Sequence, residues 1–136
     1  MRSIEFTVTG DPVPKGRPRM SRCGHAYTPE RTRKAEKRIA DAFRRLDADP
    51  FESAVSIRIE CVFTPPRSWS KRNKAAAIDG AIKKCSKPDV DNLAKTVCDA
   101  LNGIAWLDDS QIVRMSAVKR YGSESYTTVK ISEDVY

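Results

Sequence analysis

Apolar and polar residues alternate in four segments of the chain, which is the pattern of β-strands with one buried face. The clearest segment is 55–63, where Val55, Ile57, Ile59, Cys61 and Phe63 share one side. The other predicted strands are 4–8, 112–120 and 126–131. Because Gly122 lies in the short gap between the last two, we expect them to form an antiparallel hairpin.

Apolar residues at helical spacing predict three helices between these strands. The first begins at Thr28-Pro29-Glu30, where Thr28 is the expected cap and Pro29 the first helical residue. The other two run over 69–78, opened by Ser68 or Ser70, and over 91–102, with Gly103 as the stop. The order β-α-β-α-α-β-β predicts one compact α/β (α+β) domain with a mixed sheet over residues 1–136.

Composition excludes several classes of protein. The chain has no run of about 20 apolar residues, so no transmembrane helix is expected. Its start lacks the apolar block of a secretory signal, so we expect a cytoplasmic protein with reduced thiols. The four cysteines contain no C-x-x-C pair, which argues against a zinc site. His25 is the only histidine, so hydrolytic chemistry must rest mainly on carboxylates.

Positive charge is concentrated in two segments: residues 1–46 carry a net charge of +7 and residues 67–87 carry +6. The rest of the chain is net acidic, so the net charge of the whole chain is +7. Such blocks favour a polyanionic partner, although a merely solvated basic surface is nearly as good an interpretation of charge alone. The proline-rich loop 10–19 is a stiff basic segment suited to gripping phosphates. The candidate DNA-binding residues are Lys15, Arg17, Arg19, Arg22, Lys71, Arg72 and Lys87.

Aspartates gather around the third predicted helix, in the last part of the chain, which is net acidic although the whole protein is basic. Asp89 and Asp91 lie at its entry, and Asp91, Lys95 and Asp99 share one helix face because they are four residues apart. Asp108 and Asp109 follow in the next turn. Crowded carboxylates repel one another, and a divalent cation with a preference for oxygen relieves that repulsion. The cluster therefore predicts a metal-dependent phosphodiesterase.

Each of these residues also has an ordinary structural interpretation. Asp91 alone is more often a helix cap, and with Lys95 it could form an exposed ion pair. Asp108 and Asp109 could be turn residues. The catalytic interpretation rests on the combination of D-x-D, a lysine four residues later and the second acidic pair.

The same residues resemble a known family. The stretches Lys87-Pro88-Asp89-Val90-Asp91-Asn92-Leu93, Asp99-Ala100-Leu101-Asn102-Gly103 and Leu107-Asp108-Asp109-Ser110-Gln111, together with Lys95, are similar to the RusA family of Holliday junction resolvases. Looser similarity covers Pro12-Val13-Pro14-Lys15-Gly16-Arg17-Pro18-Arg19 and Pro66-Arg67-Ser68-Trp69-Ser70.

The resemblance implies a RusA-like, Mg²⁺-dependent endodeoxyribonuclease, with Mn²⁺ able to substitute, that resolves Holliday junctions by paired symmetric cuts in recombination and repair. It places catalytic roles on Asp89, Asp91, Asp109 and Lys95, and metal binding on the three aspartates, with Asp108 as a further candidate ligand. Asp99 is expected to be structural. The implied partners are branched DNA and a second copy of the chain, with no membrane and no small-molecule cofactor, and the family is typical of phages and prophages.

Two other functions remain open on the sequence. One is a non-catalytic basic module that binds nucleic acid, in which the aspartates would be structural. The other is a less selective nuclease of flaps or branched DNA with the same site.

Overall fold

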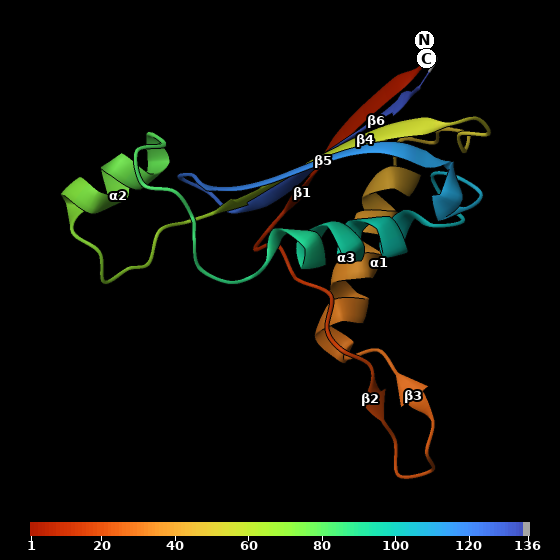
Figure 1. Ribbon diagram of the computed structural model, residues 1–136, viewed down its shortest axis with the longest axis horizontal. Coiled ribbons are helices and arrows are strands. Elements are labelled where there is room, and N and C mark those ends of the chain that lie inside the picture. Colours follow the sequence, from red (N-terminus) through yellow and green to blue (C-terminus); the bar gives the residue numbers. More distant parts are fainter. Residues whose placement is uncertain (135–136) are drawn as a thin grey trace.

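A four-stranded sheet with two helices packed on one of its faces forms the body of the protein in the computed structural model, which describes residues 1–134 (Figure 1). The strand order is β1-β6-β4-β5. Strand β6 runs antiparallel to both of its neighbours, whereas β4 and β5 are parallel. The sheet strands are β1 (Ser3–Thr9), β4 (Val55–Phe63), β5 (Ile112–Tyr121) and β6 (Tyr126–Glu133).

Helices α1 (Glu30–Arg44) and α3 (Val90–Leu101) cover the same face of this sheet (Figure 1). The alternation in β4 turns Val55, Ile57 and Ile59 toward them, and all three are essentially inaccessible to solvent. Leu93 and Leu101 of α3 pack against these strand residues in the same apolar core. Burial of this stripe fixes α3 against the sheet, and with it the acidic residues on the exposed side of the helix.

Two smaller elements project from this body (Figure 1). Helix α2 (Lys71–Ile78) lies beyond one end of the sheet, and its N-cap Ser70 accepts a hydrogen bond from the backbone N–H of Asn73. A two-stranded ribbon, β2 (Arg19–Met20) with β3 (Ala26–Tyr27), extends from the end of α1. This ribbon was not predicted, since strands of two residues carry no periodicity.

The predicted single α+β domain, its element order and its mixed sheet are confirmed. The starts of α1 and α3 shift by one residue, and α2 begins at Lys71, two residues later than predicted, with the expected Ser70 as its N-cap. Pro29 is the N-cap of α1 and makes no side-chain cap bond, so the expected cap at Thr28 is wrong. Asp89, and not Asp91, is the N-cap of α3.

The last two strands run in opposite directions, as predicted, but they are not hydrogen-bonded to each other, because β4 lies between them. Their connection crosses the end of β4. The N–H of Gly122 donates to the carbonyl of Phe63 at 2.8 Å, and the N–H of Thr64 donates to Oγ of Ser125 at 3.2 Å. A Cβ at position 122 would lie 2.4 Å from the Val62 side chain, so this crossing requires glycine.

Within residues 1–134, no helix has the length and apolar character needed to span a membrane. The four cysteines are free thiols, with Cys23 and Cys85 exposed and Cys61 and Cys98 buried.

Candidate active site

A pocket of about 530 Å³ opens between the exposed side of α3 and the first residues of β5. Asp91, Lys95 and Asp99 line it from α3, which confirms that the four-residue spacing places them on one face. Asp109 lines it from the turn before β5. The remaining wall consists of Ala94, Cys98, Ile112, Val113, Arg114 and Met115. The pocket thus combines carboxylates from two separate elements with an ammonium group and a largely apolar wall.

The N-terminus of α3 presents two carboxylates at neighbouring positions. Asp89 is the extended N-cap, with φ −71° and ψ 141°, and its side chain makes no cap hydrogen bond. Asp91 lies in the first helical turn, where the helix dipole stabilises negative charge. The structure brings Asp91 into the pocket but leaves Asp89 outside its lining.

The adjacent residues Asp108 and Asp109 have different surroundings. Asp108 caps the short 3₁₀ helix η1 (Asp109–Gln111), and its Oδ2 accepts a hydrogen bond of 2.9 Å from the N–H of Ser110. Hydrogen bonding by Ser110 holds the pKa of Asp108 below its usual value. Asp109 instead faces the pocket, and its Oδ1 accepts a 2.8 Å bond from Nε1 of Trp106.

The pocket offers some, but not all, of the carboxylates that the sequence predicted for a metal ion. Mg²⁺ commonly binds one or two protein carboxylates together with substrate phosphates and water, and Asp91 and Asp109 can supply that many. However, no group of three or more His, Cys, Asp or Glu residues in the described part of the chain is placed to hold a metal ion. The expected three-aspartate cluster of Asp89, Asp91 and Asp109 is therefore not assembled among the described residues, and the metal-ligand roles of all four aspartates, Asp89, Asp91, Asp108 and Asp109, stay predictions.

The one thiol in the pocket wall is not a nucleophile. Burial, together with the negative charges of Asp109 and Asp99, raises the pKa of Cys98 to about 12. Since the thiolate is the reactive form, Cys98 stays inert near neutral pH. The groups of the pocket lining that remain for chemistry are the carboxylates and the cations Lys95 and Arg114.

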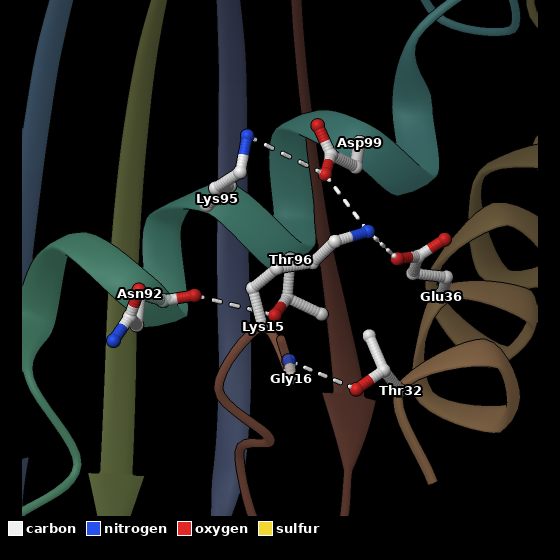
Figure 2. Close-up of polar contacts among 8 residues, drawn as sticks. All are labelled: Lys15, Gly16, Thr32, Glu36, Asn92, Lys95, Thr96 and Asp99. Carbon is white, nitrogen blue, oxygen red and sulfur yellow. Dashed lines mark hydrogen bonds and ion pairs between the residues drawn. The ribbon is translucent and has the colours of Figure 1, made fainter. Parts of the chain in front are cut away.

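The side chain of Lys15 makes two ion pairs that the sequence did not predict. Its ammonium group pairs with Glu36 of α1 at 2.6 Å and with Asp99 of α3 at 2.9 Å (Figure 2). Burial acts to lower the pKa of Lys15, but the bonds to Glu36 and Asp99 outweigh it and raise the pKa. Because this ammonium group is already paired with two acids, less of its charge is open to a phosphate, and its role as a DNA contact stays a prediction.

The other predicted DNA contacts lie on three separate segments. Arg17, Arg19 and Arg22 belong to the ribbon and the loop before it, Lys71 and Arg72 begin α2, and Lys87 precedes α3. All of them are exposed at the surface. Helix α2 is attached to the sheet through Trp69, whose ring meets that of Tyr121 edge-on at 5.4 Å.

Two residues that support the site were missed by the sequence interpretation. Trp106 positions Asp109, and the Trp-Leu-Asp-Asp run placed it close to the acids without revealing the bond. Lys119 of β5 donates to the carbonyls of Ser86 at 2.7 Å and Pro88 at 3.0 Å, which secures the segment that leads into Asp89. Nothing in the sequence signals this contact, because its partners lie 33 and 31 residues away along the chain.

Comparison with known proteins shows to which family the chain is related. The family model described as endodeoxyribonuclease RusA matches residues 9–132. A protein of Bacillus subtilis (strain 168), named there as uncharacterized protein YqaN, is 37% identical over 139 residues, and the match covers 98% of each chain.

Proposed function

The chain belongs to the RusA family of endodeoxyribonucleases, and from that premise we propose that it resolves four-way DNA junctions by metal-dependent phosphodiester hydrolysis. The observation that carries the proposal is the pocket shared by Asp91, Asp109 and Lys95. The two aspartates offer oxygen ligands for a divalent metal ion, and the lysine offers a positive charge for a phosphate. Metal-dependent hydrolysis of a phosphodiester needs both.

Asp91 and Asp109 would hold Mg²⁺, or Mn²⁺ in its place, from separate walls of the pocket. When bound, such a cation supplies Lewis-acid activation of the scissile phosphate and of water. The Trp106 indole holds the Asp109 carboxylate in place, and the N-terminal end of α3 stabilises the negative charge of Asp91. Asp89 is two residues from Asp91, and we propose it as a ligand that joins once DNA and cation are present.

Lys95 would contact the phosphate that is cut. Its side chain is 61% exposed and lies one helical turn beyond Asp91, so its ammonium group can follow a phosphate into the pocket. A lysine ammonium is a compact charge that adapts to a phosphate without requiring a fixed geometry.

The exposed cations on the ribbon and on α2 would hold the DNA arms. Arg17, Arg19 and Arg22 project with the ribbon on one side of the body, and Lys71 and Arg72 with α2 on another (Figure 1). Contacts spread over such a distance suit a substrate with several arms better than a single duplex. A homodimer is part of the proposal, because two opposed strands of a two-fold junction are most simply cut by a two-fold protein.

The test is incubation of the full chain with a synthetic four-way junction, with and without Mg²⁺. We expect paired cuts only with the metal. Asp91→Asn should bind the junction at least as well as the unaltered protein and fail to cut it, since it keeps the fold and removes a ligand. Cutting by Asp91→Asn would contradict the proposal. So would an unaltered protein that binds the junction but does not cut it with Mg²⁺, which would indicate a non-catalytic binding module.

A broader nuclease of branched DNA is the second candidate, because the pocket itself has features for one phosphate and none that read a four-way shape. Cleavage of a junction, a flap and a plain duplex under the same conditions separates the two. An enzyme that resolves four-way junctions should cleave the junction clearly faster than the flap or the duplex. Equal cleavage rates on junction and flap would favour the broader activity.

A further inference from the structure

Lys15 joins three parts of the protein that are far apart in sequence. It lies in the proline-rich loop, and its ammonium group contacts Glu36 of α1 and Asp99 of α3 (Figure 2). The Lys15 side chain is only 17% exposed, whereas that of Lys95, one turn before Asp99, is 61% exposed. A long cationic side chain is confined in this way only where its charge is used inside the structure.

The backbone of the loop is fixed at the same place. The N–H of Lys15 donates to the carbonyl of Asn92 at 3.0 Å. The N–H of Gly16 donates to Oγ1 of Thr32, also at 3.0 Å (Figure 2). A Cβ at position 16 would lie 2.8 Å from that hydroxyl, so only glycine allows the approach. These bonds determine where the Lys15 side chain starts and therefore which carboxylates it reaches.

Asp99 is shared between two lysines. Its Oδ2 lies 2.9 Å from Nζ of Lys15 and 3.8 Å from Nζ of Lys95. The nearer cation is the more buried one, so Lys15 compensates most of the carboxylate charge. Lys95 is thereby held near Asp99 by a long contact but is not bound tightly to it, and its ammonium group stays available to the pocket.

We propose that Lys15 is a positioning residue for Lys95, acting through Asp99. By neutralising Asp99 from the loop side, it prevents that carboxylate from drawing Lys95 into a close ion pair and away from the scissile phosphate. This inference rests on the proposed function, in which Lys95 contacts the DNA. It assigns to the loop a part in cleavage that is separate from DNA binding.

The physical basis is the four-residue spacing of Lys95 and Asp99, which favours an ion pair on a helix surface. Without Lys15, Asp99 and Glu36 have no common cation, and Lys95 is the nearest replacement for Asp99. A displacement of about 1 Å at a reacting centre is enough to slow a reaction by about a hundredfold. The decrease is expected in the rate of cleavage by bound protein and not in affinity.

The experiment compares Lys15→Met, Glu36→Gln, Asp99→Asn and the double variant Lys15→Met/Asp99→Asn by single-turnover cleavage of a four-way junction at saturating protein. We expect Lys15→Met to slow cleavage at least about tenfold while the Kd for the junction changes less than about twofold. Glu36→Gln is the matched control, because it leaves the Lys15–Asp99 pair in place, and its rate should change less than about threefold. In the Asp99→Asn background, Lys15→Met should have almost no further effect, since no carboxylate remains to draw Lys95 away.

Weaker binding of Lys15→Met with an unchanged rate at saturation would overturn the inference, because it would make Lys15 a phosphate contact. Equal effects of Lys15→Met in both backgrounds would overturn it as well. Should Lys15→Met not fold, as seen by circular dichroism, Lys15→Gln repeats the comparison, since an amide can still hydrogen-bond to the two acids. Failure of the proposed function is distinct: the unaltered protein would then not cleave the junction in any divalent metal.

Discussion

The indole of Trp106 donates a hydrogen bond of 2.8 Å from Nε1 to Oδ1 of Asp109, which joins a fully buried core residue to a carboxylate of the pocket. The ring forms part of the same apolar core as Leu101, and Asp109 begins η1. One carboxylate oxygen of Asp109 is therefore oriented by the core itself. The packing of Trp106 in the core therefore determines the orientation of the Asp109 carboxylate in the pocket.

Trp106→Phe should reduce cleavage more than binding. Phenylalanine keeps most of the apolar contact but cannot donate to Asp109, so the carboxylate is no longer held in a fixed orientation. We expect single-turnover cleavage to fall about tenfold and the free energy of unfolding to fall by about 1–3 kcal/mol. Phe43→Leu, a change in the same core but on α1 and outside the pocket lining, is the control. An unchanged cleavage rate in Trp106→Phe would show that the bond has no part in catalysis.

Elements with a strong local pattern could be predicted from the sequence almost to the residue. Strand β4 matches its alternating segment at both ends, and α3 begins one residue earlier than expected. In both, the apolar residues that define the pattern are those buried in the core, as for Ile59 and Leu101. Local periodicity and the final packing agree there, so sequence alone was sufficient.

The pairing of the strands was harder to predict from the sequence, because it is decided by contacts between distant segments. A short gap with Gly122 favours direct pairing of β5 and β6, yet β4 takes the place between them. The decisive contacts are those of Gly122 with Phe63 and of Ser125 with Thr64, at the end of β4. They involve a segment that no local rule connects to the gap.

The shared helix face of the acids on α3 could be predicted, but the surroundings of the individual acids could not. Spacing placed Asp91 and Asp99 on one face, whereas the divergence of Asp108 and Asp109 depends on hydrogen bonds from Ser110 and from the Trp106 indole. The ion pairs of Lys15 could not be predicted for a similar reason. A lysine among prolines normally points to solvent, and its two acidic partners come from distant helices.

The exposed arginines of the ribbon and its preceding loop predict a salt-dependent contribution to DNA binding. Removal of one phosphate contact should reduce the slope of log K against log salt by about 0.9. Replacing Arg17, Arg19 and Arg22 by glutamine should therefore flatten the salt dependence of junction binding, measured by fluorescence anisotropy. Lys130→Gln, at an exposed position of β6, is the control on a distant surface and should leave the slope unchanged. An unaltered slope in the arginine variants would place the DNA elsewhere.

Burial divides the cysteines into two chemical classes. Burial raises the pKa of Cys61 to about 11, and burial with nearby acids raises that of Cys98 to about 12, while Cys23 and Cys85 are exposed. Iodoacetamide at pH 8 should label only the exposed pair in the folded protein and all four in denaturant, as counted by mass spectrometry. Rapid labelling of Cys98 in the folded protein would contradict its burial at the pocket.

The same thiols make stability depend on pH in a defined direction. Their pKa values in the folded protein lie above the ordinary value of 9.0, so the folded state keeps protons that the unfolded chain releases. Their contribution is fully present below pH 9 and decreases as the pH rises from 9 toward the folded values. Urea unfolding should thus show a lower midpoint at about pH 10.5 than at about pH 8.5, with a smaller decrease in Cys98→Ala.

Asp108 and Asp109 provide a direct test of which acid binds the metal. Asp109 faces the pocket, so Asp109→Asn removes a ligand and should lower Mg²⁺-dependent cleavage by more than about a hundredfold. The carboxylate of Asp108 accepts the N–H of Ser110, and an asparagine oxygen at this position preserves that cap. Asp108→Asn should therefore retain cleavage within about threefold, in the same assay and at the same Mg²⁺ concentration. A comparable decrease in Asp108→Asn would mean that η1 rearranges when DNA and metal bind, because the cap bond and metal coordination would compete for the same carboxylate.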